Sequence, residues 1–496
     1  MIVHSASTIT IGVLLAAVLL CLRALSTGRM SSLLGLVAVP LGVSLLGRPD
    51  IWLALAVALY QSGLKPPLGG TNLTLYHVLS FLLIGALGLR LILNPRGRAR
   101  RSPATKYALL FLAVLAVTMA TRGLGLRILG SRLWGGAPYV SIVLAIGLFL
   151  LAERAPLSAR LWRQAVLAMC LVAQIPALAQ FAYLRAGERW WWLWAFVQIR
   201  PSVVGEDALS GAEYLMRYQT GMAVLLVMVP LLLFERPMRG ARWIVTAFFV
   251  ALAMLFAGFS GFRSAYIQIP LLVLSWLALR ERRPPWGRLA AVGALFLAVL
   301  AVMALFARHL PSSFQRALSL IPFADVTPAV KADADATTIW RLVVWLRALG
   351  DIPKYWLLGS GFAFDPREVE IIMLLRIWSR EWAFVTHNYH NGILSLLITL
   401  GVGGLFAGCA FLISIGRTHW RLTRAVWPDE LSRRVHLVMT SWFTTQIVLF
   451  LTIYGDTQIS FPMFFFQAMV LEGLALNRAL ALENPAAAEA GAAPPG

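Results

Sequence analysis

The chain has 496 residues, of which 59% are hydrophobic and only 13% carry a charge. A soluble domain has about 25% charged residues, so this composition excludes one. The formal net charge of +21 would suggest a nucleic-acid partner in a soluble protein, but here the basic residues lie between apolar runs and act as a topology signal. We therefore predict an all-α polytopic membrane protein that does not bind nucleic acid.

The apolar runs are long enough to cross a hydrocarbon core of about 30 Å. A backbone in lipid has to satisfy its own hydrogen bonds, so each run is predicted to be a helix. We expect about 12–14 transmembrane helices, and the short pieces around Pro40 and Pro49 decide the number. The expected spans are 8–25, 31–47, 50–64, 73–93, 105–121, 137–153, 164–184, 216–234, 242–260, 264–280, 289–307, 388–415, 435–454 and 460–480.

The first run lacks a basic start and a clear cleavage site, so we expect a retained span rather than a signal peptide. Residues 1–307 are predicted to form the main transmembrane bundle and 387–482 the C-terminal transmembrane helices. The low-complexity tail, 483–496, is expected to be disordered and cytoplasmic.

Basic clusters are separated from one another by even numbers of expected crossings. All of them can therefore face the cytoplasm together, as the positive-inside rule requires of a bacterial inner-membrane protein. The clusters lie at 96–106, 154–163, 236–242, 280–288 and 417–434.

Two segments remain on the outer, periplasmic side. The first, about 185–215, begins with a tryptophan cluster that indicates an interfacial anchor, with sugar stacking as the alternative. The second, 308–386, is a long periplasmic loop with helical patterns over 338–349 and 367–384. We expect it to form a helical cap on the outer membrane surface.

Two histidines, His387 and His390, precede the span expected over 388–415, and Asn391 follows the second. An outward-facing helix N-terminus favours anions and disfavours an imidazolium, which keeps a histidine neutral and usable as a base. Two alternatives remain: the histidines are interfacial caps, or they form a metal pair, although no nearby residue clearly completes such a site.

Several arginines make the outer face basic. Arg263 lies in a very short outer turn, where an arginine near hydrocarbon is expensive unless it is paired, so a bound anion is expected, with snorkelling as the alternative. Arg341 and Arg347 lie in the long loop, and the other outer segment contains Arg200 and Arg217; any one of these could be an ordinary surface arginine. A bis-phosphate ligand would explain their convergence. Weaker candidates of the same kind are Arg122, Arg127 and Arg132.

At these residues the chain resembles the O-antigen ligase and O-antigen polymerase superfamily of bacterial membrane glycosyltransferases. The ligase pattern is His, then Asn, Ser or Gln, nine residues, Gly, two residues, then Gly, Thr or Tyr. His390-Asn391 followed by Gly401 and Gly404 fits it, and the glycines are expected to allow close helix packing. His387 does not fit, because Ile398 falls where the glycine belongs.

Two further stretches carry the resemblance. Arg263 is similar to the arginine of the family's Ser-x-Ser-Arg-type motif, although Gly-Phe precedes it here. Arg341-x3-Trp345, followed by Leu358-Gly359-Ser360-Gly361, is similar to the family's Arg-x3-Trp…Gly-x-Gly stretch in the large periplasmic loop.

The resemblance implies a glycan donor carried on undecaprenyl pyrophosphate, with membrane lipid around the protein. It implies a glycan acceptor, either lipid A–core or a lipid-linked repeat unit, and an inverting transfer at the periplasmic face without a metal or other cofactor. His390 would be the base and Arg263 the second catalytic residue. The substrate-binding residues would be Arg341, Arg200, Arg217, Arg347, His387 and Asn391.

Other functions remain open at this stage. A ligase and a polysaccharide polymerase share this site, and the ligase pattern fits slightly better. A lipid-linked oligosaccharide flippase or an anion transporter should place charges near mid-membrane and often shows repeated halves. A non-catalytic assembly partner would not need a basic outer face.

Overall fold

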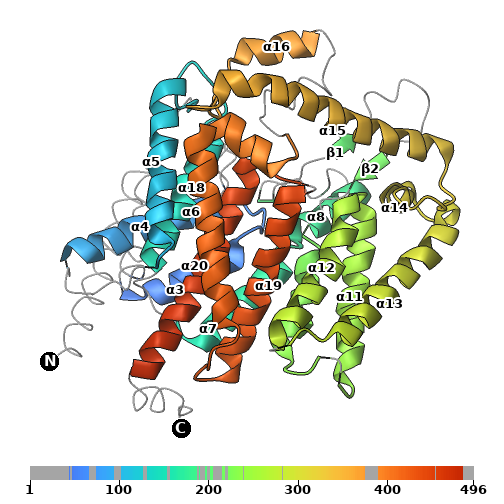
Figure 1. Ribbon diagram of the computed structural model, residues 1–496, viewed down its shortest axis with the longest axis horizontal. Helices are drawn as coiled ribbons and strands as arrows, with labels where there is room; N and C mark the ends of the chain where they lie inside the picture. Colours follow the sequence, from blue (N-terminus) through green and yellow to red (C-terminus); the bar gives the residue numbers. More distant parts are fainter. Residues whose placement is uncertain are drawn as a thin grey trace.

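In the computed structural model of the chain, the apolar runs form α-helices, which confirms the predicted all-α polytopic class (Figure 1). The structure describes residues 44, 47–65, 74–93, 102–126, 131–152, 157–186, 189, 196–197, 202–204, 215–217, 222–237, 239–281, 283–374, 389–452 and 454–483. The predicted span 8–25 and the tail 484–496 lie outside these residues, as does span 31–47 apart from positions 44 and 47.

The described residues form a series of helices. They are α3 (Pro49–Leu59), α4 (Leu75–Leu93), α5 (Thr105–Arg122), α6 (Ala137–Ala152), α7 (Ala159–Val172), α8 (Ile175–Ala186), α10 (Val224–Leu233), α11 (Arg242–Ser260), α12 (Arg263–Arg280), α13 (Trp286–Leu305), the 3-10 turn η3 (Ala307–His309), α14 (Ser312–Leu318), α15 (Pro328–Tyr355), α16 (Pro366–Leu374), α18 (Gly392–Leu422), α19 (Glu430–Thr452) and α20 (Thr457–Glu483). One antiparallel pair of short strands, β1 (Ser202–Val204) and β2 (Leu215–Arg217), interrupts the helical series.

Within the described residues, 7 helical stretches are long and apolar enough to cross a membrane, so the chain is a multi-pass membrane protein. The shorter apolar helices are Pro49–Leu59, Leu75–Leu89, Ala137–Leu151 and Val224–Leu233. The full number of 12–14 spans stays a prediction, since part of it rests on residues outside the described set. The long stretches are Thr105–Arg122, Ala159–Tyr183, Arg242–Ser260, Trp286–Leu305, Gly392–Leu422, Glu430–Thr452 and Thr457–Glu483.

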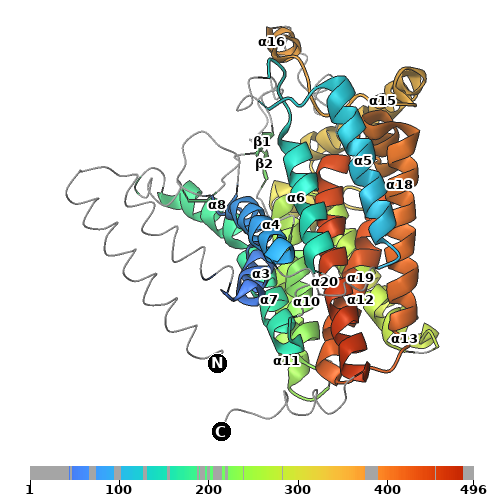
Figure 2. The same cartoon turned by 90° about the vertical axis from the view of Figure 1, so that its left-hand side faces the viewer.

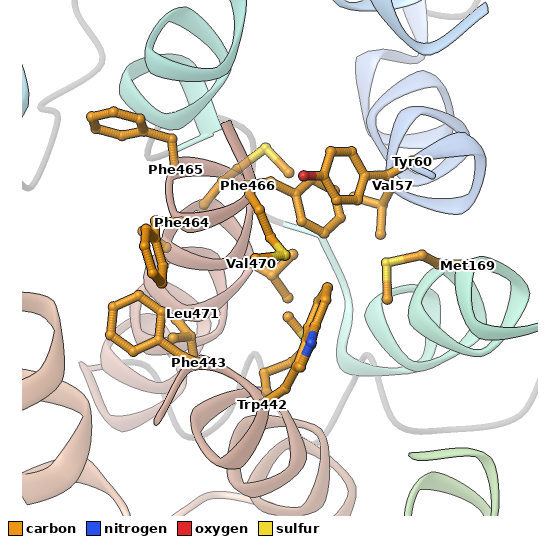
Figure 3. Close-up of a cluster of buried hydrophobic side chains, with 14 of the residues drawn as sticks. Val57, Tyr60, Met169, Trp442, Phe443, Phe464, Phe465, Phe466, Val470 and Leu471 are labelled. Atoms are coloured by element: carbon orange, nitrogen blue, oxygen red, sulfur yellow. The ribbon is translucent and has the colours of Figure 1, made fainter. Parts of the chain in front are cut away.

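The last helix, α20, forms the centre of the bundle and packs along α6 and α19 (Figures 1 and 2). Its aromatic run fills the core: Phe466 stacks on Tyr60 with ring centroids 3.8 Å apart, and Phe461 stacks on Phe111 at 4.6 Å. Figure 3 shows this region, where Trp442 of α19 lies beside Val470 of α20. Buried aromatic side chains of this size dominate packing energetics, so α20 is the element around which the others assemble.

A second helical layer covers one end of the bundle. The 28-residue α15 begins at Pro328, a residue suited to the first helical turn, and is about 42 Å long. It lies across the end of the bundle, with α16 further out (Figures 1 and 2). The helix predicted over 338–349 lies inside α15. Of the helix predicted over 367–384, residues up to 374 lie in α16 and the rest are outside the described residues.

Buried polar side chains join helices at the opposite end of the bundle. The Nδ1 atom of His419 in α18 lies 3.0 Å from Nε2 of His436 in α19, and its Nε2 atom lies 3.3 Å from the carboxylate of Glu472 in α20. Ser102, just before α5, donates to the same carboxylate at 2.6 Å. Four segments distant in the sequence therefore meet at one polar cluster.

Candidate active site at the α15 end of the bundle

His390 lies immediately before α18, next to Asn391, whose side chain accepts a hydrogen bond from Leu394 N at 3.1 Å and caps the helix. Its ring contacts the ring of Trp340 in α15, with centroids 5.4 Å apart, and that of Tyr454 in the α19–α20 connection, at 5.0 Å. His390 has a φ of 52°, a left-handed conformation that is uncommon outside glycine. Such a conformation persists when the surrounding structure imposes it.

The electrostatic surroundings of His390 favour the neutral imidazole. Burial, and next the positive charge of Arg341, lower the pKa of the ring from 6.5 to about 4. A histidine in this state is uncharged at neutral pH and can accept a proton. Sequence reasoning attributed neutrality to the helix N-terminus, whereas the causes here are burial and a neighbouring arginine.

Arg341 is half-buried and is the arginine that acts on His390. Burial and the charge of Arg316 lower its pKa, but a guanidinium in a protein stays charged. Its Nε atom is buried, and no described residue accepts a hydrogen bond from it. A half-buried guanidinium whose Nε donor is not engaged suits an anionic ligand.

Arg263 begins α12 and reaches α15. Its guanidinium donates to Thr338 Oγ1 at 2.8 Å and to the carbonyl oxygen of Ala334. Its charge interacts with those of Arg316 and Arg341. The two arginines predicted from the sequence, Arg263 and Arg341, therefore lie in the same region. Thr338 is one helical turn from Arg341, which places both arginines on the same stretch of α15.

Arg316 in α14 is a site neighbour that sequence reasoning missed. It is only 3% exposed, and its guanidinium contacts the Asp333 carboxylate, the Gly261 carbonyl at 3.0 Å and Thr337 Oγ1 at 2.8 Å. These bonds occupy the guanidinium and join the turn before Arg263 to α15. A buried arginine whose donors are all directed at protein groups has a positioning role.

The remaining predicted site residues are not gathered around His390. Arg347 follows Arg341 by six residues, which rotates it by about 240° around α15, and it is exposed. Arg217 lies in β2, where only the backbone is described, and Arg200 and His387 lie outside the described residues. Their roles as substrate ligands stay predictions, as does that of Asn391 beyond its capping bond.

The connection between α19 and α20 contributes two further residues that sequence reasoning did not select. The charge of Arg341 interacts with Tyr454, whose ring contacts His390. Asp456 is 2% exposed, and burial raises the pKa of its carboxyl group to about 7. Gly455 between them lies against Gly392, and its carbonyl accepts from Ser395 Oγ at 3.1 Å. The available signal was a Tyr-Gly-Asp sequence between two apolar runs.

The glycine motifs of the loop and of α18 fit into each other. At Gly401 the backbone leaves helical geometry, with φ 70° and ψ −172°. Ser360 N donates to the Ile398 carbonyl at 2.7 Å and Gly361 N to that of Thr399 at 3.0 Å, while Val402 N donates to the Trp356 carbonyl at 2.6 Å. The turn after α15 thus provides hydrogen bonds at the break in α18, and it fixes the N-terminal part of α18 beneath α15.

Neither Gly401 nor Gly359 leaves room for a side chain, because each lies against the backbone of the other segment. A Cβ atom at Gly401 would lie 2.3 Å from the Leu357 carbonyl oxygen, and one at Gly359 would lie 2.3 Å from that of Thr399. Both residues also have a φ in the left-handed region that favours glycine. The spacing of the histidine motif therefore reflects a helix break, in addition to the close packing expected from sequence.

Comparison with known families covers this same part of the chain. Residues 246–409 match the family model described as O-antigen ligase. Over this stretch the chain is similar to O-antigen ligases. The stretch extends from α11 into α18 and includes Arg263, Arg341 and His390, so the recognition made from the motifs is confirmed at the level of the superfamily. No curated protein matches the chain. This match supports a ligase- or polymerase-type function in general.

Proposed function

We propose that the chain is a membrane glycosyltransferase of the O-antigen ligase or polymerase type. It moves a glycan from undecaprenyl pyrophosphate to a hydroxyl of an acceptor sugar, on lipid A–core or on a lipid-linked repeat unit. The observation that carries the proposal is a half-buried, neutral His390 beside the half-buried cation Arg341, with Arg263 in the same cluster.

The proposed step is a single displacement with inversion. His390 removes the proton of the acceptor hydroxyl, and the oxygen attacks the anomeric carbon of the donor glycan. The bond between that carbon and the pyrophosphate oxygen breaks, and the electron pair leaves with undecaprenyl pyrophosphate. Arg341 and Arg263 offset the growing negative charge, and the protonated histidine then returns its proton to water.

The location follows from charge distribution. The described basic residues around the α18–α19 connection, such as Arg417 and Arg433, lie at the opposite end of α18 and α19 from His390. With those residues in the cytoplasm of a bacterium, the site opens at the periplasmic face of the inner membrane.

A transporter remains the alternative, but the described arginines of the site gather at one end of the bundle rather than at mid-membrane. The discriminating experiment is transfer from a purified lipid-linked donor to an acceptor, followed by detection of product and of released undecaprenyl pyrophosphate. We expect both, with an inverted anomeric configuration in the product and full activity in excess EDTA. If the intact donor instead crossed a vesicle membrane without bond cleavage, the chain would be a flippase and not a glycosyltransferase.

Within this assay Arg341→Ala has a matched control in Arg347→Ala. Both substitutions remove one arginine from α15, but only Arg341 acts on His390. We expect Arg341→Ala to abolish most transfer and Arg347→Ala to retain more of it. Equal losses in both variants would contradict the placement of the pyrophosphate at Arg341.

A further inference from the structure

Two cations flank one aromatic ring at the C-terminal end of α15. The guanidinium of Arg122, the last residue of α5, lies 5.8 Å from the ring centroid of Tyr355, and the ammonium of Lys354 lies 4.8 Å from it. Both cationic side chains are exposed. The charge of Asp351, one turn earlier on α15, also interacts with that of Lys354. Two positive charges and one negative charge leave the group with a net positive charge.

The backbone holds one of these cations in place. Arg122 Nε donates to the Gly359 carbonyl at 2.8 Å, and Thr118 Oγ1, one turn earlier on α5, donates to the Leu358 carbonyl at 3.3 Å. The end of α5 is thereby attached to the turn that supports the break in α18. The Arg122 guanidinium is positioned without being covered.

An apolar groove of about 210 Å³ adjoins the cations. Its lining comes from α5, from the residues after α15 and from α18, and includes Val114, Val117, Thr118, Leu357, Leu400 and Gly403. Val117 is 49% exposed and Leu357 57%, so the groove opens outward from the bundle. Gly403 has no side chain, so α18 leaves the groove open at this position.

We propose that this groove and the two cations bind an anionic phospholipid, with an acyl chain along the groove and the headgroup phosphate at Arg122 and Lys354. An apolar surface of a membrane-spanning bundle is covered by acyl chains, and basic residues at its edge select an anionic headgroup. A lipid bound in this way contacts α5, the turn after α15 and α18 at once, and it stabilises their junction.

The site is separate from the proposed reaction centre and does not rest on the proposed function. Lys354 is thirteen residues beyond Arg341 on α15, a distance of about 20 Å along the helix. No histidine of the described residues lines the groove. A phospholipid rather than a reacting lipid-linked glycan fits a site with cations and no base.

The test uses the full chain in nanodiscs of phosphatidylcholine doped with phosphatidylglycerol. Native mass spectrometry counts the lipids that remain bound after transfer to detergent. The wild-type chain should retain phosphatidylglycerol in preference to phosphatidylcholine. Lys354→Gln should lower that retention about fivefold, the equivalent of the ~1 kcal/mol that one basic residue contributes near anionic lipid. Val117→Trp should lower it by filling the groove without a change of charge.

Two control variants make the same kinds of change outside the proposed site, both on α5. Lys106→Gln removes a lysine at the opposite end of α5 from Arg122, and Leu110→Trp enlarges a side chain that is 39% exposed and lies outside the groove. Both should retain phosphatidylglycerol as the wild type does. Equal retention of the two lipids, or loss in the controls as large as in the test variants, would overturn the assignment. If equimolar undecaprenyl phosphate displaced phosphatidylglycerol, the assignment would also fail, because the groove would then be a site for a polyprenyl lipid.

Discussion

Arg341 is the charged neighbour of His390: burial, and next the charge of this arginine, lower the pKa of the imidazole to about 4. The same arginine has a buried Nε atom that no described residue engages. One side chain therefore keeps the base unprotonated and also offers a donor to an anion. This relationship leads to the first prediction.

The acid limb of the pH profile should lie well below the ordinary histidine range. The group acts as a base when deprotonated, so kcat/KM should be flat above about pH 5 and fall as the pH drops through about 4. Arg341→Gln removes one of the two causes of the lowered pKa, so the limb should move to higher pH, toward 6.5. A limb at the same pH in both proteins would exclude Arg341 as the neighbour that tunes the base.

His390→Ala should cut turnover by about 10²–10⁴-fold, the usual contribution of a positioned general base. His387→Ala should cost less, because only His390 has the motif spacing to Gly401. Glycan transfer by purified variants at matched abundance measures both. Transfer by His390→Ala at the wild-type rate would refute the mechanism, and unchanged size-exclusion behaviour would establish that the variant is folded.

Arg263→Ala should cripple transfer, and Arg263→Lys should restore only part of it. A lysine keeps the charge but cannot donate from a planar fork to two acceptors, as Arg263 does to Thr338 and Ala334. Rates should be compared with thermal midpoints of the same variants, because the arginine also joins α12 to α15. Complete rescue by lysine would mean that only its charge matters.

Gly401→Ala should destabilise the chain by about 1–3 kcal/mol or more, since it forces a left-handed φ and a contact with the Leu357 carbonyl. Gly416→Ala is the matched control: it lies in the same helix, and a Cβ atom there meets nothing within 4 Å. Thermal unfolding in detergent would compare them. Equal midpoints would show that the break in α18 tolerates a side chain.

The two ends of the bundle should be accessible from opposite sides of the membrane. In a chain without its native cysteines, Leu320→Cys and Val426→Cys provide exposed reporters at 53% and 73% exposure. An impermeant thiol reagent should label Leu320→Cys from the periplasmic side of intact spheroplasts and Val426→Cys only after lysis. Labelling of both from the same side would contradict the layout and the mechanism together.

Sequence reasoning predicted the membrane class, the helix over 338–349 and the shared region of Arg263, Arg341 and His390, because hydropathy, loop charge and motif spacing are local properties. It did not find Arg316, which folds back on Asp333 of α15 and has no local signal. Nor did it find Tyr454 and Asp456, since their proximity to the His390 segment depends on how α19 and α20 pack. The break at Gly401 was also missed, because its hydrogen-bond partners come from another segment.

The central place of α20 has a consequence for biosynthesis. This helix follows all the other described helices in the chain, yet 72% of its apolar window is buried inside the bundle, and its Glu472 completes the cluster of His419 and Ser102. During synthesis α6 therefore enters the bilayer well before α20, the helix that it contacts most extensively. Nascent chains that stop before residue 457 therefore lack the aromatic side chains with which α20 fills the core, and we expect them to be unstable in the membrane.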